Sequence, residues 1–597
     1  MYENDTVHIN VINKMISDST TIHWHGIHPV DTPWTDGALG VTQAPITPGN
    51  NFTYKFRAWP AGTHYWHSHM DGMQSAKGMR GPFIVKKRQD RYAHLYDEEK
   101  VVVLADEWQN PDVCLKLEGA MAGNDVCSDI DYASLNGQVA RGDLQKYDIG
   151  KYPYPLVEVD PGKCYRMRFI MMASNAENYI LTMAGHNMTL IALDGVDVDP
   201  IMVSHLNIHI GERADVILCA DQKPGYYPLE MMYDYACTLT PGHFIPPGFH
   251  AVSSCKFYSF LHYSGMHDWP IGPGAPTSPK GTGGGADPLP VSGTPFDLTT
   301  PADWTKTKPV DVRPEPEEPD ARFVITLGLK GPTYGKPTDE PLTKGRWYMD
   351  VDGRRMSWSK PETPLIQTKG KCGAGGVPVL DIPENATVIE LVINNLSPTA
   401  HNIHMHGMLF QVINVANFEW CNVNKTSCFL MPEVANPCPA EDRGYADEDH
   451  KYDGITQFYW GCKYNNQTDK KSQNLVAPLR KDSFQIWQRS WAVIRFRADA
   501  PGMWQFHCHM EQHVPLGMVM ALNVLPSKQP PVPADVPTEG PCPGWSTPTG
   551  KAVGGVEGGV EEVVAENKNL AQRVKDLEKE LAVATNSQCD RTVRRKH

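Results

Sequence analysis

The stretch HCHMEQH, residues 507–513 of this 597-residue chain, decides both the fold and the chemistry. It sets one cysteine, Cys508, between His507 and His509. Successive side chains of a β-strand point to opposite faces of the sheet. In a strand, the thiol therefore faces away from both neighbouring imidazoles, and the two faces carry different ligand sets.

Three further strings of the chain are rich in histidine, and each contains a His-x-His pair. They are HWHG at residues 23–26, HYWHSH at 64–69 and HNIHMHG at 401–407, and with the first string they hold 11 of the 23 histidines. Both imidazoles of such a pair lie on one face of a strand. Four pairs can converge on a cage of eight imidazoles, which suits zinc, copper, iron or nickel.

The spacing within the strings predicts two separate sites. His404 and His406 share a face, whereas His401 lies an odd number of residues from His404 and faces away. One site then collects His23, His25, His67, His69, His404, His406, His507 and His509, and the other collects His401, Cys508 and, after a turn, His513. Two histidines and one cysteine with a distant thioether form a blue-copper ligand set, and Met518 is placed to supply the weak axial sulfur. The covalent path between the two sites is one residue long.

The rest of the chain indicates an all-β protein with three β-rich parts. Short alternating runs, separated by turn sequences rich in Gly and Pro, are typical of sandwiches or barrels. We predict a first segment (residues 1–95), a second segment (96–265), a Pro/Gly-rich surface linker (266–320), a third segment (321–526) and a Pro/Gly-rich tail (527–559).

The C-terminal stretch 560–585 has a different pattern, with apolar residues at heptad spacing. Asn567 falls at an a position of this seam, and Arg573 can pair with Glu578 of a second copy. About three and a half heptads are marginal for association. We therefore expect a short coiled coil that forms at most a weak parallel homodimer.

Composition excludes two classes of partner and indicates a compartment. The net charge is −14, so no basic field exists to bind nucleic acid. No apolar run approaches the ~18 residues of a membrane span. Fourteen cysteines and seven glycosylation sequons, at Asn4, Asn51, Asn187, Asn385, Asn395, Asn424 and Asn466, indicate an extracellular or secretory protein. The chain begins at once with a strand-like pattern, so we expect that the signal peptide is missing from this sequence.

The four strings resemble the copper-binding motifs of the multicopper oxidases, the family of laccases and ascorbate oxidase, in the family's order over residues 1–526. The resemblance implies three cupredoxin-like domains, the first of which lacks some N-terminal strand residues in this sequence, and four copper ions. It implies His23 and His404 as ligands of the type 2 copper, His25, His67, His69, His406, His507 and His509 as ligands of the type 3 pair, and His401, Cys508, His513 and axial Met518 as ligands of the type 1 copper.

The sequence departs from the family pattern at three positions. Asn402 and Met405 stand where the third string usually has proline and leucine, and both lie between ligands. His64 has no copper assigned to it, and the surrounding GTHYWHSH is more similar to animal-type laccases than to the common fungal form. We expect His64 to be a surface residue or to lie behind the ligands.

Three carboxylates are candidates for supporting roles. Reduction of dioxygen to water consumes protons, so a buried cluster needs groups that relay them. By resemblance, Asp36 and Glu511 are candidates for this relay, although Asp36 in the sequence TDG is also a good turn residue. By the same resemblance, Glu177 in SNAENYI is a candidate to accept a proton from a phenol, with a solvated loop residue as the alternative.

The resemblance implies a laccase-like oxidase that takes electrons from small phenolic donors and passes them to dioxygen. A ferroxidase acting on Fe(II), another metal oxidase or an ascorbate oxidase would share every copper ligand. A copper-storage protein without turnover is an alternative from another class. A zinc hydrolase could also use His-x-His pairs, but it has no need of a cysteine inside one of them.

Overall fold

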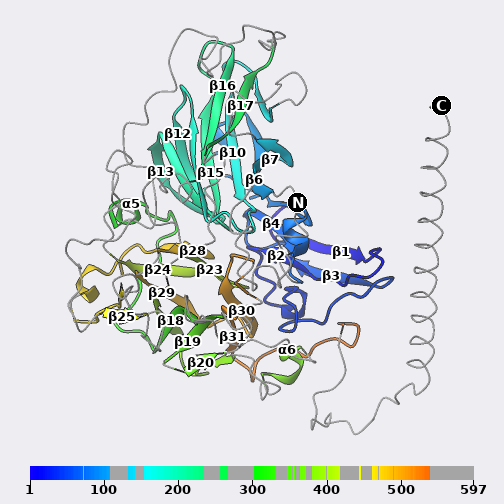
Figure 1. Ribbon diagram of the computed structural model, residues 1–597, viewed down its shortest axis with the longest axis vertical. Helices are drawn as coiled ribbons and strands as arrows, with labels where there is room; N and C mark the ends of the chain where they lie inside the picture. Colours follow the sequence, from blue (N-terminus) through cyan, green and yellow to red (C-terminus); the bar gives the residue numbers. More distant parts are fainter. Residues whose placement is uncertain are drawn as a thin grey trace, which may run out of the picture. The chain divides into compact units, whose positions relative to one another are not determined.

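The computed structural model describes residues 1–70, 73–107, 132–140, 154–233, 256–265, 301–330, 346–352, 354–356, 364–370, 379–397, 400–416, 443–445, 460–467, 469–487, 490–511, 513–514 and 517–537 (Figure 1). Strands make up most of the regular structure of these residues, which confirms the all-β prediction. None of the helices in this part of the chain is long and apolar enough to span a bilayer. The predicted coiled coil at 560–585 lies outside the described residues.

The first segment contains two small antiparallel sheets. One pairs β1 (Thr6–Ile12) with β3 (Asn51–Arg57), and exposed and covered side chains alternate along both strands as a half-buried sheet requires. The other has the order β2 (Ile22–His25), β4 (Gly62–Ser68), β5 (Arg80–Val85). Two of the four histidine strings lie on β2 and β4, and all four residues of β2 are buried.

The second segment consists of two facing sheets of mixed strand direction. The larger has the order β13 (Val196–Val203), β12 (Met188–Leu193), β15 (Arg213–Cys219), β10 (Cys164–Met171), β6 (Glu98–Glu107), β7 (Tyr132–Leu135), β8 (Gln138–Ala140). The smaller has the order β14 (His205–His209), β11 (Asn178–Met183), β16 (Tyr226–Met232), β17 (Lys256–Tyr263), β9 (Leu156–Val159). Apolar side chains of both sheets, Leu104 and Leu229 among them, share one core.

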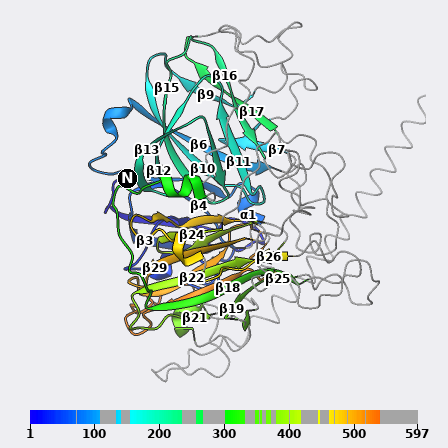
Figure 2. The ribbon, with the colours of Figure 1, turned by 90° about the vertical axis from the view of Figure 1, so that its left-hand side faces the viewer.

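The third segment repeats this plan, and its larger sheet is displayed in Figure 2. That sheet has the order β20 (Arg354–Met356), β19 (Arg346–Val351), β18 (Ala321–Lys330), β22 (Val388–Asn395), β29 (Trp491–Arg497), β24 (Phe410–Val415), β27 (Leu479–Lys481). The facing sheet has the order β21 (Val379–Asp381), β31 (Val519–Val524), β30 (Gly502–Cys508), β23 (His401–Met405), β28 (Ser483–Ile486). The third histidine string begins on β23 and the fourth at the end of β30, and these two strands are hydrogen-bonded neighbours.

Short elements complete the described residues. They are the hairpin of β25 (Arg443–Tyr445) and β26 (Trp460–Cys462), the helices α1 (Met73–Ala76), α5 (Pro301–Lys306) and α6 (Leu365–Thr368), and the 3₁₀ turns η1 (Pro33–Thr35), η2 (Ala93–Leu95) and η7 (Asp469–Ser472).

Parts of the predicted linker and tail are packed rather than solvated. Trp304 of α5 is buried, and its indole N–H donates to the carbonyl of Val412 in the third segment. At the other end, Val536 is buried in the apolar cluster of the first segment. Composition alone predicted solvated stretches here, because Pro and Gly greatly outnumber the few apolar residues that pack against the core.

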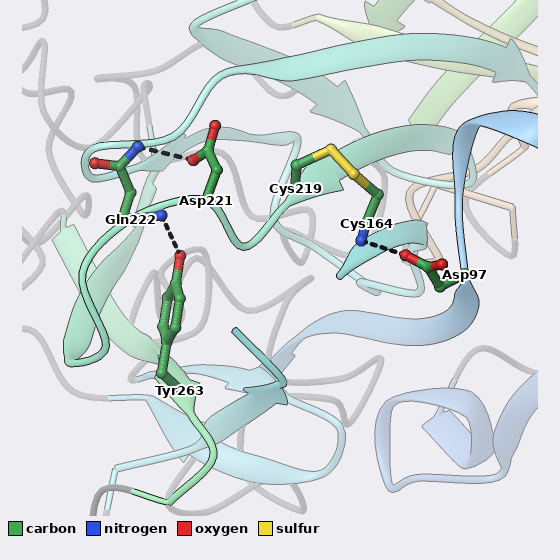
Figure 3. Close-up of a disulfide and its surroundings, with 6 residues drawn as sticks. All are labelled: Asp97, Cys164, Cys219, Asp221, Gln222 and Tyr263. Atoms are coloured by element: carbon green, nitrogen blue, oxygen red, sulfur yellow. Dashed lines mark hydrogen bonds between the residues drawn. A yellow bond between two sulfur atoms is a disulfide. The ribbon is translucent and has the colours of Figure 1, made fainter. Parts of the chain in front are cut away.

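One disulfide is present among the described residues, between Cys164 and Cys219 (Figure 3). It joins directly opposed residues of β10 and β15. The backbone N–H of Cys164 also donates to the carboxylate of Asp97, 2.9 Å away. The sequence left the pairing of thirteen cysteines open, and the structure supplies this pair and leaves Cys508 as a free, buried thiol.

Candidate metal centres

Strand pairing brings the histidine strings together in two pairs. In the first segment, His23 of β2 lies opposite His67 of β4. In the third segment, His404 of β23 lies opposite His507 of β30, and the next pair along is Ile403 with Cys508. The β2–β4 sheet and the β23–β30 sheet lie next to each other (Figure 1). Contacts of His23 with His404 and of His25 with His509 show that histidines from distant parts of the sequence face one another.

The eight histidines predicted for one face form a single buried cluster. Ring nitrogens face each other across the two segments, with 3.4 Å between Nε2 of His23 and Nε2 of His404. Nδ1 of His25 and Nε2 of His509 are 3.2 Å apart. Further nitrogen atoms converge within 4.8 Å of one another in the groups His69, His406, His507 and His23, His25, His67. The convergence that strand parity predicted is therefore present.

Most of these rings are oriented by a hydrogen bond from the nitrogen that points away from the centre. The donor and acceptor pairs are His23 Nδ1 with Asp36 O (2.7 Å), His67 Nδ1 with Ser68 O (3.0 Å), His404 Nδ1 with Asp482 O (2.8 Å), His406 Nδ1 with Asp36 Oδ2 (2.8 Å), His507 Nδ1 with Cys508 O (2.8 Å) and His25 Nε2 with Asp482 Oδ1 (3.3 Å). Such a bond fixes the tautomer and leaves the other nitrogen with a lone pair for a metal ion.

The electrostatics of the cluster favour neutral imidazoles. Burial, followed by the charges of neighbouring rings, holds the pKa of His25, His404 and His406 well below the usual range. Burial likewise lowers the pKa of His507 to about 4. At neutral pH these rings therefore carry no proton that would compete with a cation.

A second, smaller site contains the cysteine. The Sγ atom of Cys508 lies 3.6 Å from Nδ1 of His401 and 3.3 Å from Nδ1 of His513, and the two nitrogens are 3.2 Å apart. A point equidistant from three atoms so spaced lies about 2 Å from each, close to a metal–nitrogen bond length. The hydroxyl of Ser397 is 2.7 Å from Nε2 of His401, so Nδ1 is the nitrogen turned to the thiol.

Both sites fit copper by the chemistry of their donors. Burial raises the pKa of the Cys508 thiol far above its usual value, so a cation is needed to hold the thiolate there. Nε2 of His67 is buried and has no hydrogen-bond partner among the described residues. A soft sulfur with two imidazoles in one site, and imidazoles throughout the other, match the preferences of copper.

The structure places Met518 beside the cysteine site. Its backbone carbonyl accepts a hydrogen bond from the N–H of Cys508 at 3.1 Å, and its own N–H donates to the carbonyl of His513 at 3.0 Å. The side chain is fully buried in the same apolar cluster as Cys508. Its assignment as the axial ligand remains a prediction.

Asp36 contacts the histidine cluster directly. Its carboxylate accepts the Nδ1–H of His406 and lies 3.4 Å from Nδ1 of His23. The following residue, Gly37, has a φ of +82°, and a Cβ there would come 1.8 Å from the carbonyl oxygen of Ile22. Glycine thus allows the TDG turn to approach β2, and the turn delivers the carboxylate. The two interpretations of Asp36, turn residue and functional carboxylate, are compatible.

Glu511 and Glu177 occupy different settings. Glu511 lies 3.6 Å from Nδ1 of His67, and its side chain is 12% exposed, against 1% for Asp36. Glu511 is therefore the carboxylate with access to water. Glu177 is buried in the loop between β10 and β11, so the alternative of a solvated loop glutamate is wrong. Its contact with a donor stays a prediction.

The departures from the family pattern have structural roles. His64 is fully buried, not on the surface, and its Nε2 donates to the carbonyl of Pro60 at 2.9 Å. The side-chain amide of Asn402 donates to the carbonyl of Ile210 in the second segment. Met405 is buried in the core. His64 belongs to none of the groups of described side chains that could hold a metal ion.

Sequence reasoning missed Tyr65 and Asp482, which touch predicted ligands, and Arg213, which binds Asp482. The hydroxyl of Tyr65 lies 2.9 Å from Nε2 of His509, and its ring stacks on His25. Asp482 contacts His25 and His404, and Arg213 makes a bidentate ion pair with Asp482. Only Tyr65 gave a signal in the sequence, since it lies within a histidine string.

Comparisons with known proteins agree with this architecture. Family models described as multicopper oxidase match residues 1–90, 98–241, and 349–435 with 453–528. Laccase-6 of Oryza sativa subsp. japonica is 26% identical over 593 residues, which cover 92% of this chain and 88% of the rice protein. Laccase-4 of Trametes villosa is 25% identical over 538 residues, covering 87% of this chain and 82% of the fungal protein.

Solved structures show the same fold. The crystal structure of Fet3p, described as a multicopper oxidase that functions in iron import, matches with a TM-score of 0.64 and 21% identity and covers 88% of this chain and 84% of that one. The laccase from Botrytis aclada matches with a TM-score of 0.61 and 21% identity, covering 88% and 81%. These likenesses confirm the prediction of cupredoxin-like domains.

Proposed function

Because the chain belongs to the multicopper oxidase family, we propose that it removes single electrons from small phenolic or related donors and reduces dioxygen to water. The observation that carries the proposal is the placement of Cys508. Its thiol belongs to the small site, while both sequence neighbours, His507 and His509, belong to the histidine cluster. The relatives named laccases support the choice of phenolic donors.

Copper ions, one in the cysteine site and three in the histidine cluster, would supply the one-electron redox steps when bound. The protein supplies the path between the sites. An electron that reaches Cys508 has only one residue of main chain to cross before His507 or His509. His513 is the most exposed ligand of the small site, at 5% against 0% for His401 and Cys508, so donors are expected to approach there.

The carboxylates supply the protons that the reaction consumes. Four electrons and four protons convert one dioxygen to two waters, and the cluster itself is buried. Glu511, partly exposed and facing His67, is proposed to take protons from water and pass them inwards. Asp36, fully buried, is proposed to hold the ring of His406 and to share in the relay.

An oxygen electrode with a panel of donors tests the proposal. Uptake with a diphenol that exceeds uptake with Fe(II) or ascorbate is the expected result. Uptake with Fe(II) alone would assign the chain to the metal oxidases. A blue, copper-loaded protein that consumes no oxygen with any donor would indicate storage and overturn the proposal.

Replacing Met518 with leucine is expected to raise the reduction potential of the cysteine site and to extend the range of donors. A thioether stabilises the oxidised metal relative to a side chain that does not coordinate. Redox titration of the blue band measures the change. Met520→Leu, at a buried methionine of β31, is the matched control and should leave the potential unchanged. An unchanged or lowered potential in Met518→Leu would refute the axial assignment.

We also propose an extracellular or secretory location. The Cys164–Cys219 disulfide is typical of oxidising compartments. Five sequon asparagines, Asn4, Asn51, Asn187, Asn385 and Asn466, are exposed. Asn424 lies outside the described residues.

The buried sequon at Asn395 yields a specific expectation. Its side-chain amide donates to the carbonyls of Ile486 and Trp487 at 3.1 and 3.0 Å, and the residue is fully buried. A chain with a glycan there could not form these bonds. Mass spectrometry of the folded, secreted protein should therefore find glycans at exposed sequons and none at Asn395. Substantial modification of Asn395 in folded protein would contradict this structure.

A weak homodimer through residues 560–585 stays a prediction, because these residues lie outside the described part of the chain. Deleting residues 556–597 should leave a monomer of unaltered specific activity, which light scattering and the oxygen electrode can check together.

A further inference from the structure

The second segment holds no predicted copper ligand, yet one of its side chains reaches the histidine cluster. Arg213 of β15 is fully buried and points at Asp482, next to the start of β28. Its two terminal nitrogens donate to the two carboxylate oxygens of Asp482, at 2.6 and 2.5 Å. A bidentate pair of this kind fixes the direction of the carboxylate as well as its charge.

Asp482 in turn faces two of the predicted ligands. Its carboxylate is 3.3 Å from Nε2 of His25 in the first segment, and its backbone carbonyl accepts the Nδ1–H of His404 in the third. The neighbouring hydroxyl of Ser483 is 3.3 Å from His25 and 3.2 Å from His404. A shift of this short stretch would turn both rings.

Residues of the second segment contact the stretch Lys481–Ser483 at more than one position. The ammonium group of Lys481 forms ion pairs with Asp194 and Glu212, at 3.2 and 3.0 Å. Arg213 also donates from Nε to the carbonyl of Thr63, on the strand that carries His67. One guanidinium therefore contacts the first and third segments while belonging to the second.

From this geometry we propose that Arg213 is a positioning residue for the histidine cluster, a proposal that rests on the proposed function. It clamps Asp482 so that His25 and His404 present their metal-binding nitrogens in fixed directions. The second segment thereby acts on the site without supplying a ligand. Because outer partners of metal-bound histidines typically contribute about 10- to 100-fold in affinity, the loss should be measurable.

The test compares copper affinity at the two sites of one molecule. We expect Arg213→Met to weaken the copper affinity of the histidine cluster about 10- to 100-fold in chelator competition. The cysteine site, read by its blue absorption, should keep its affinity and serve as the internal reference. The type 2 signal in electron paramagnetic resonance should change or disappear. Arg213→Lys, which keeps the charge but not the bidentate contact, should show a smaller loss, and Asp482→Asn should resemble Arg213→Met.

Arg166→Met is the matched control. Arg166 is buried in the adjacent strand β10 and makes a comparable pair with Asp215, but no predicted ligand lies in contact with that pair. If Arg166→Met and Arg213→Met weaken the copper affinity of the histidine cluster equally, the effect is one of general packing and the proposal is overturned. A folded Arg213→Met protein whose cluster keeps its full copper affinity would also overturn it. If Arg213→Met does not fold, Arg213→Lys and Asp482→Asn decide in the same way. Wild-type protein that binds no copper would instead refute the proposed function itself.

Discussion

Replacing Cys508 with serine is expected to abolish the blue colour and to reduce donor oxidation by more than about 1,000-fold. Only a thiolate gives this site its absorption and its electron path, and a neutral hydroxyl of nearly the same size provides neither. The eight histidines of the cluster are untouched, so three copper ions per chain should remain. Visible spectroscopy, metal analysis and oxygen uptake on one sample measure the three quantities.

A double variant, Cys164→Ser with Cys219→Ser, is the control for loss of cysteine as such. It removes the disulfide, which typically costs about 2 to 5 kcal/mol of stability, but leaves Cys508 in place. It should therefore stay blue and active at moderate temperature. Donor oxidation at a comparable rate in Cys508→Ser would show that electrons enter the cluster by another path.

Replacing Glu511 with glutamine should slow turnover by about 100- to 10,000-fold, the usual range for losing a group that transfers protons. The amide keeps the shape of the side chain but cannot carry a proton inwards. Colour and copper content should be unchanged, because Glu511 is not a member of the groups of described side chains that could hold a metal ion. Steady-state oxygen uptake is the measurement, with Glu511→Asp expected to retain part of the activity.

Glu107→Gln offers a matched control for this variant. Glu107, at the end of β6 in the second segment, is also a partly exposed carboxylate, and it contacts Arg80 of the first segment rather than a predicted ligand. Its replacement should leave turnover unchanged. If Glu511→Gln loses copper in proportion to activity, the residue serves the structure of the site and the relay is wrong.

The alternation of side chains along a strand was enough to predict which residues belong to which of the two sites. It separated Cys508 and His401 from the eight clustered histidines, and the structure groups them so. Parity allowed the strings of β23 and β30 to converge, although it could not predict that His404 and His507 are direct cross-strand neighbours. The all-β class followed from the same alternation.

The outer partners of the ligands could not be predicted. Lys481, Asp482 and Ser483 read as an ordinary polar stretch, and Arg213 as one charged residue in a strand. Their importance arises from contacts between residues hundreds of positions apart, such as Arg213 with Asp482 at a separation of 269. Local patterns carry no information about such contacts. The burial of Trp304 and Val536 in stretches of linker-like composition was missed for the same reason.

The separation of 457 residues between His25 and Asp482 bears on how the protein matures. At typical rates of synthesis, roughly 20 to 90 seconds pass between the appearance of these two residues on the ribosome. During that interval the first histidines have no partners from β23 or β30, so the emerging chain can offer only an incomplete site. Metal insertion must therefore follow completion of the chain. In a pulse-chase experiment, copper bound in the histidine cluster should lag behind the full-length polypeptide, and a copper supply that is present only during translation should leave the cluster empty.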